Sequence, residues 1–359
     1  MNYIPKSYSI CILVLLALVF SPTETVAQQG KWRIKNRFQA GYEYDNNIRE
    51  NPSDSLSDLG DSSLRLLFQS RAIRSQPKNQ FKLSYQGGLQ SYFQHSIENK
   101  LINELQAAAV FKRKHYAIGI LARGRLKIYL NDVLDYSTGS TEMFVRLPMF
   151  LSFSPKFSVG ISGLHYQNFS QFDYSEKYFS WSFLKKITKR LTAVIFASGN
   201  VLNFHRTALI FDPGNANLIF DRTDQQDKQF NTRLQFNYTK HFLLNMSYLF
   251  QYNSSNSFGY TYSRHQFILV FGLPLPQRIW IRGYGAVQIK NYRDENIPIF
   301  PLDVDTERQE SNFFILDVSK DFNPNVTLLT RVAVYNNESV IRNRFYKKTL
   351  LTLGFDYRF

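Results

Sequence analysis

The C-terminal segment 349–359 places the strongest constraint on the fold of this chain. Apolar side chains occupy every second position from Leu351 to the last residue, Phe359, and polar residues or glycine lie between them. This period-two alternation predicts a β-strand with one apolar face. Because chain ends usually fray unless another element holds them, the final strand needs a partner strand elsewhere in the chain.

An early segment offers that partner. Between Trp32 and Tyr44, large apolar side chains alternate with charged and polar ones. The stretch from Trp32 to Tyr42 would rise about 25 Å at the usual strand pitch and a tilt of roughly 40°. That height equals the apolar band of an outer-membrane barrel, and aromatic residues at both ends suit the membrane–water interfaces.

Alternation recurs along the rest of the chain. We assign strands to residues 64–72, 81–93, 101–111, 116–130, 143–153, 157–169, 178–184, 191–204, 230–238, 242–252, 260–273, 279–292, 312–318, 326–334 and 345–359. With the first segment, these ranges predict about 16 strands, and roughly 12 to 18 are compatible with the pattern. Short turns alternate with longer, acid-rich connections such as 47–61, 207–227 and 293–310. This order is typical of an antiparallel meander.

The final segment resembles the closing strand of bacterial outer-membrane β-barrel (porin-like) proteins. The residues that carry the resemblance are Thr352, Gly354, Tyr357 and Phe359. It implies that the barrel-assembly machinery recognises this strand, which then seals the barrel against the first strand. The predicted fold is therefore all-β: a single transmembrane antiparallel up-and-down barrel with short periplasmic turns and longer extracellular loops. Outer-membrane lipid and lipopolysaccharide would surround it. A secreted soluble sandwich or propeller also alternates, and it remains the alternative.

The amino terminus has the features of a secretory signal. Lys6 precedes an apolar run at residues 10–20, and Thr25-Val26-Ala27 provides a small-residue cleavage site. We therefore expect a cleaved signal peptide at residues 1–27 and a barrel at residues 28–359, in the bacterial outer membrane. The single cysteine, Cys11, lies within the signal, so the mature chain has no disulfide, cysteine-bound metal or thiol nucleophile.

Charge gives the functional hypothesis. The chain has a formal net charge of +15, and its acidic residues gather in the predicted outer loops. Opposite the apolar face we expect few carboxylates, chiefly Glu43, Glu104, Asp317 and Asp356. Rings of arginine and lysine are typical of anion pores, so we predict a porin-like channel for small solutes with a basic, anion-preferring lumen. The candidate selectivity residues are Arg65, Arg71, Arg123, Arg125, Lys127, Arg146, Arg233, Arg282, Lys290 and Arg331.

Two other functions stay open. One is a dedicated export conduit or assembly partner for an acidic polysaccharide or surface component. The other is a closed barrel with a structural or adhesive role, in which arginine side chains fill the lumen. A position of the gene among polysaccharide-synthesis genes would favour the first, and a lack of conductance would favour the second.

Catalysis and cofactors are not expected. The six histidines are scattered, and none has a serine and a carboxylate at a recognisable spacing. Asp303, Asp305 and Glu307 are weak candidates for Ca²⁺, but the segment has no glycine and a solvated run of charges is favoured. Nucleic acid is not an expected partner, because the cations alternate along strands. A homotrimer is left open.

Overall fold

The chain forms one closed β-barrel. The computed structural model describes residues 30–48, 60–131, 134–148, 153–212, 214, 217–294, 312–337 and 346–359. Within this part of the chain, sixteen antiparallel strands each pair with their sequence neighbours, and the first pairs with the last. The predicted fold class and strand number are confirmed. The predicted signal segment 1–27 and the acidic run at Asp303, Asp305 and Glu307 lie outside the described residues.

The strands fall close to the predicted ranges. Their bounds are β1 (Trp32–Asp45), β2 (Asp61–Ser75), β3 (Asn79–Tyr92), β4 (Lys100–Lys112), β5 (Ala117–Tyr129), β6 (Tyr136–Arg146), β7 (Phe153–Tyr166), β8 (Tyr174–Lys186), β9 (Leu191–Asp212), β10 (Asn217–Thr239), β11 (Leu243–Ser255), β12 (Tyr262–Leu275), β13 (Ile279–Tyr292), β14 (Asn312–Asp321), β15 (Val326–Asn337) and β16 (Tyr346–Arg358). Short 3₁₀ turns lie at Ser96–Glu98, Ser170–Phe172 and Pro276–Arg278. None of the helices in the described ranges is long and apolar enough to cross a membrane.

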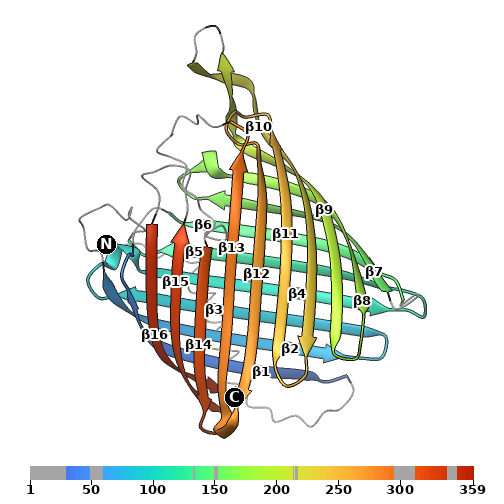
Figure 1. Cartoon of the computed structure of the whole chain (residues 1–359), viewed down its shortest axis with the longest axis vertical. Helices are drawn as coiled ribbons and strands as arrows, with labels where there is room; N and C mark the ends of the chain where they lie inside the picture. Colours follow the sequence, from blue (N-terminus) through green and yellow to red (C-terminus); the bar gives the residue numbers. More distant parts are fainter. Residues whose placement is uncertain are drawn as a thin grey trace.

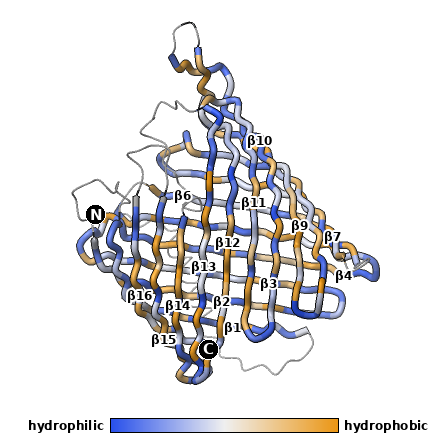
Figure 2. Tube along the Cα trace, viewed as in Figure 1, coloured by the Kyte–Doolittle hydropathy of each residue, from blue (hydrophilic) through white to orange (hydrophobic). Residues whose placement is uncertain are grey.

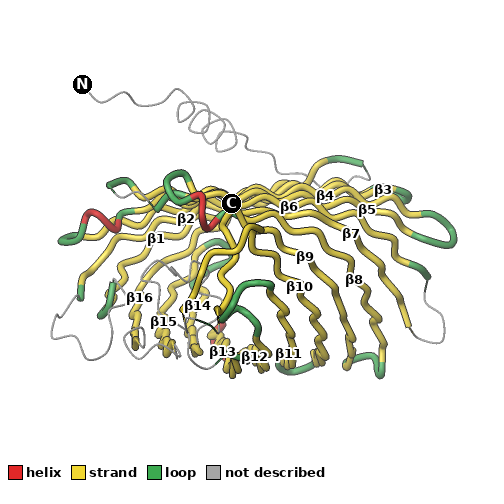
Figure 3. The backbone as a smooth tube through the Cα atoms, turned by 90° about the horizontal axis from the view of Figure 1, so that it is seen from above, coloured by secondary structure: helices red, strands yellow, loops and turns green. Residues whose placement is uncertain are grey.

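The strands are steeply tilted around the barrel. In Figure 1 the first strands run behind the later ones and cross them at a steep angle. Opposite walls of a closed barrel cross in this way because every strand tilts in the same sense against the barrel axis. Figure 3, seen from above, shows strands β1–β7 along one side of the barrel and β11–β16 along the other.

The two faces of the barrel wall differ in chemistry. Residues opposite each other on paired strands share a face, so the register follows each face around the barrel. One face carries exposed apolar side chains such as Ile161 and Phe179, whereas the other carries buried polar ones, including Asp45, Ser63 and Asp356, which are 0–2% exposed. Side chains converge inside a closed barrel and spread apart outside it, so the polar face lines the lumen.

The apolar outer wall identifies the environment of the barrel. Hydrophobic and hydrophilic residues alternate along the strands in Figure 2. Closure satisfies the backbone groups between strands, and the apolar outer face is matched to hydrocarbon. The chain therefore has the architecture of a membrane-spanning β-barrel, as predicted.

The connections alternate in length, also as predicted. One end of the barrel carries the short turns 76–78, 113–116, 187–190, 240–242, 276–278 and 322–325. The longer connections, including 93–99, 167–173 and 256–261, lie at the other end. In outer-membrane barrels, short turns are periplasmic and long loops extracellular, and we use these names for the two ends.

Two predicted boundaries were wrong. The segment 207–227 was interpreted as a loop, but β9 and β10 continue through it as a paired hairpin that projects beyond the extracellular end (Figure 1). In this hairpin the Thr223 hydroxyl and the Arg222 backbone N–H donate hydrogen bonds to the Asp221 carboxylate. These hydrogen bonds hold the pKa of Asp221 below its usual range. The strand predicted at 143–153 is instead β6, Tyr136–Arg146, because its outward side includes Gly139 and Thr141, which give no apolar signal.

The terminal strand closes the barrel against β1. Pairing runs from Asp45 opposite Leu350 to Arg37 opposite Arg358. Phe359 then exchanges two backbone hydrogen bonds with Asn36: its N–H donates at 3.1 Å, and its carbonyl accepts at 2.9 Å. The predicted seal between the first and last strands is confirmed to the final residue.

Deletion of Phe359 is expected to lower the yield of folded barrel. It removes two backbone hydrogen bonds, together about 1–3 kcal/mol, and the ring that stacks on Tyr357 at 5.5 Å. Folded and unfolded forms can be separated by their mobility on unheated gels. Phe359→Tyr, which keeps the backbone and the ring, should fold like the wild type, and an unchanged yield after the deletion would contradict the expectation.

Candidate functional site

Strand register places every predicted selectivity residue on the lumen face. For example, Arg71 lies between Lys35 and Ser84 on neighbouring strands, and Arg123 lies between Gln106 and Ser140. The same reasoning applies to Arg65, Arg125, Lys127, Arg146, Arg233, Arg282, Lys290 and Arg331. These residues come from several strands and do not form one ring.

Two of the three cations of β5 share a single carboxylate. Glu104 on β4 accepts two hydrogen bonds from Arg123, at 3.0 and 2.9 Å, and two from Arg125, at 3.2 and 3.1 Å. Lys127 has its ammonium over the rings of Tyr129 and Tyr136, at 4.6 and 5.5 Å from their centroids. The cluster keeps an excess of positive charge, because one carboxylate faces two guanidinium groups.

Other predicted cations are held by carboxylates near the seam. Arg331 donates to both oxygens of Asp317, at 2.6 and 3.1 Å. Arg65 approaches buried Glu43 at 3.3 Å, and that carboxylate also accepts from Gln90 at 2.9 Å. These contacts connect neighbouring strands and stiffen the wall on either side of the β1–β16 seam.

The remaining predicted cations contact neutral groups. Arg233 lies 5.3 Å from the ring of Phe196, and Arg282 donates to the Ser319 hydroxyl at 3.4 Å. Arg71 forms no ion pair with a described carboxylate. Two further contacts are Arg146 over Phe144 and Lys290 over Tyr262, at 5.9 and 4.1 Å. Their positive charge is therefore not neutralised by these neighbours.

Sequence reasoning missed part of the lumen charge. It had placed Asp61 and Asp227 in outer loops, and both instead lie in strands on the lumen face. Glu142 was missed because the strand boundary was wrong, and it binds Lys156 at 2.5 Å. These groups could have been found by extending the period-two alternation of each strand beyond its predicted ends, since every second residue faces the lumen. The lumen-facing residues not predicted include Asp45, Asp61, Lys100, Glu142, Lys156, Glu176, Asp227, Arg264, Asp321 and Lys348.

The charge of the lumen is unevenly distributed. Among the described lumen residues, cations outnumber carboxylates and are densest on β1–β5. They include Arg33, Lys35, Arg37, Arg65, Arg71, Lys82, Arg123, Arg125 and Lys127. In a closed ring of sixteen strands, β11 lies opposite β3. The wall around β11 carries fewer cations, and amides and hydroxyls lie between them.

That opposite wall is a hydrogen-bonded amide network. The Gln251 amide donates to Gln229 at 3.0 Å, and the Asn231 amide donates to the Ser198 hydroxyl at 3.2 Å. Asn237 accepts from Gln235 at 2.9 Å. Cations are thus densest on one side of the lumen. On the other side fewer cations, Arg233, Arg264, Arg282 and Lys290, lie among amides and hydroxyls.

Aromatic residues and cations alternate at the extracellular mouth of the lumen. Lys100 lies near the rings of Tyr92 and Tyr129, at 5.5 and 6.0 Å. Farther round, Arg206 lies near Phe204 and Tyr260, at 5.0 and 4.7 Å. Such contacts hold cations in place without neutralising them.

Two of the described histidines contact carboxylates. His165 contacts Asp173 at 2.6 Å, and the same carboxylate accepts the Tyr166 N–H at 2.7 Å. His95 and Asp61 form a similar contact at 3.3 Å, and Asp61 also accepts backbone N–H groups of the loop. Both pairs hold loop ends to strands. No group of three potential metal ligands occurs among the residues described here.

The solved structures that are similar to this chain include a porin and an outer-membrane protein. An anion-selective porin from Comamonas acidovorans is 9% identical over 92% of this chain and 100% of that one, with a TM-score of 0.49. OccAB4 of Acinetobacter baumannii is 9% identical over 92% and 99%, with a TM-score of 0.48. OpdK of Pseudomonas aeruginosa is 8% identical over 92% and 99%, with a TM-score of 0.46.

No family model and no curated protein sequence matches the chain. At such low identities and TM-scores, the assignment of the barrel rests on the strand pairing of this chain and not on its likeness to other structures.

Proposed function

We propose that this barrel is an outer-membrane channel for small solutes that prefers anions. The observation that carries the proposal is the dense set of cations on the lumen side of β1–β5. A water-filled barrel of sixteen strands has room for solutes. Fixed positive charge between low-dielectric walls raises the local concentration of anions and repels cations.

The ion pairs do not cancel this preference. Lys35, Arg71 and Arg123 lie along one line of paired positions across the wall, with Ser84 and Gln106 between the two arginines. Among the described carboxylates, Glu104 binds both Arg123 and Arg125. A carboxylate so engaged offers little to a passing cation, whereas the surplus guanidinium charge attracts anions. Because the lumen is solvated, the preference should weaken as the salt concentration rises.

The test measures the reversal potential of the current through the barrel in a planar bilayer under a salt gradient. The wild type should favour chloride over potassium, and Arg123→Gln/Arg125→Gln/Lys127→Gln should lower the anion-to-cation permeability ratio several-fold, since Glu104 is then unopposed. Lys320→Gln, an outward-facing control on β14, should leave the ratio unchanged. An absence of conductance would overturn the channel function and favour the closed barrel. An unchanged ratio in the triple variant would show that these cations do not line the path.

A second candidate is a conduit for an acidic polysaccharide. It is favoured by the combination of a cationic wall, an amide wall that can bond hydroxyl groups, and aromatic rings at the mouth. In the same bilayer, an oligogalacturonate should block the current at lower concentration than a neutral oligosaccharide of equal length. Equal block by both would remove support for this candidate and leave the small-anion channel.

The terminal strand carries a separate proposal. We propose that Thr352, Gly354, Tyr357 and Phe359 form the segment that the barrel-assembly machinery recognises. Tyr357 and Phe359 lie on the outward face, whereas Thr352 and Gly354 face the lumen. Crosslinking from the outward positions during assembly would test it, and the absence of crosslinks to that machinery would contradict it.

A further inference from the structure

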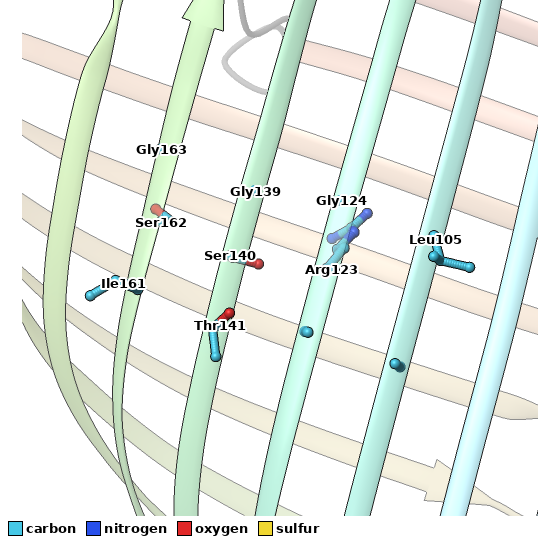
Figure 4. Close-up of a pocket in the computed structure, with 11 residues that line it drawn as sticks. Leu105, Arg123, Gly124, Gly139, Ser140, Thr141, Ile161, Ser162 and Gly163 are labelled. Atoms are coloured by element: carbon cyan, nitrogen blue, oxygen red, sulfur yellow. The ribbon is translucent and has the colours of Figure 1, made fainter. Parts of the chain in front are cut away.

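The outer wall of the barrel carries a hollow near the extracellular end. It holds about 520 Å³ and extends across β4, β5, β6 and β7. Figure 4 shows Gly124, Gly139 and Gly163 on three adjacent strands, between Leu105 on one side and Ile161 on the other. Register aligns the three glycines opposite one another. A Cβ built at Gly139 would meet no atom within 4 Å, so the hollow is open to the membrane.

Two outward-facing lysines lie beside this hollow. Lys177 on β8 is opposite Ile161, which bounds the hollow, and it is also opposite Val201 on β9. On its other side, Val201 is opposite Lys228 of β10. The two lysines are therefore two strands apart, about 10 Å. Neither forms an ion pair with any carboxylate in the described part of the chain.

The surroundings of these lysines change from apolar to polar along the strands. Toward the periplasm, the next outward residues are the exposed rings of Phe179 and Phe230. Toward the extracellular end, they are Ser175 and Gln226, which are both opposite Asn203 on β9. The lysines thus lie at the boundary between the apolar belt and the polar rim, where lipid headgroups begin. A lysine on the lipid-facing side is costly near the membrane centre and is tolerated near the interface.

We propose that the hollow and the two lysines form one binding site for a phosphorylated, acylated glycolipid of the outer leaflet. An acyl chain would occupy the glycine-lined hollow, and phosphate would bind Lys177 and Lys228. Charge complementarity selects this occupant, because an apolar partner would leave both ammonium groups without an anion. A second copy of the barrel would bring the same lysines and repel. The site lies outside the lumen and does not depend on the proposed channel.

The test measures lipid retention by native mass spectrometry. The intact barrel is released from detergent micelles that contain diphosphorylated lipid A, and the fraction carrying lipid is followed with lipid concentration. Lys177→Gln/Lys228→Gln is expected to weaken apparent binding about tenfold or more. Gly139→Leu, which fills the hollow and keeps both lysines, should also weaken it. Dephosphorylated lipid A should bind to the wild type as weakly as lipid A binds to the lysine variant.

A matched control separates the site from general effects on folding. Lys185 faces outward on the same strand near the periplasmic end, with its ammonium 4.7 Å from the ring of Phe153. Lys185→Gln should retain lipid A like the wild type. Equal retention by all variants, or an equal loss in variants and control, would overturn the proposal, as would binding that is indifferent to phosphate.

Discussion

Replacing Gly354 with valine is expected to prevent normal closure of the barrel. A Cβ at this position would lie 2.8 Å from the Ala40 carbonyl oxygen and 3.2 Å from the Gly41 Cα, both on the backbone of β1. Backbone atoms cannot move aside as the end of a side chain can. The clash could be relieved only by separating β16 from β1. The separated strand edges would then have no hydrogen-bond partners in lipid.

Band shift on unheated gels and far-ultraviolet circular dichroism would measure the effect. We expect most Gly354→Val protein to migrate as the unfolded species under conditions in which the wild type folds. Gly199→Val is the matched control, because its added atoms enter open space on the outer face. If both variants fold equally well, the close approach at the seam is not limiting.

Replacing Lys348 with methionine is expected to destabilise the barrel by about 3 kcal/mol or more. The Lys348 ammonium lies 2.7 Å from Asp45 across the seam, and the two side chains are only 6% and 1% exposed. Removing the lysine alone leaves a buried carboxylate without its cation. Most of the loss comes from that uncompensated charge, because a well-paired buried ion pair adds little net stability over neutral groups.

Urea unfolding of the refolded barrel in micelles would test this expectation, with the midpoint as the measure. The double variant Lys348→Met/Asp45→Asn removes both charges and should recover a large part of the lost stability. Lys185→Gln, far from the seam, should leave the midpoint unchanged. Equal midpoints for the single and double variants would show that the ion pair is not what stabilises this part of the seam.

The sequence predicted most of the barrel, because lipid contact imposes a regular pattern. Strands with large outward residues, such as Phe157 and Val159 on β7, could be located from alternation alone. Alternation does not identify β6, because Gly139 and Thr141 face outward there. These small outward residues line the hollow proposed as a lipid site, and their small size is also why the sequence of β6 lacks an apolar alternation. Likewise, acidic residues hid the β9–β10 hairpin, since outside the membrane its strands have no lipid to match.

The lumen was predicted in part. Which cations face inward follows from counting by two along each strand, and register agrees for Arg71, Arg123 and Arg331. Which cations are paired does not follow. Glu104 meets both Arg123 and Arg125 because of the stagger between β4 and β5, and stagger depends on how the whole sheet closes. Sequence patterns therefore predict the sign of the lumen charge but not how that charge is distributed.

The difference between the two walls of the lumen implies a field across the pore as well as along it. The dense cations on β1–β5 face a wall around β11 where fewer cations lie among amides, so a solute in transit experiences a transverse gradient of potential. A small ion would be drawn to one wall, whereas a longer solute with charge at one end and hydroxyl groups at the other would align across the pore. The orientation in which a solute enters, and not only its charge and diameter, would then govern how fast it passes.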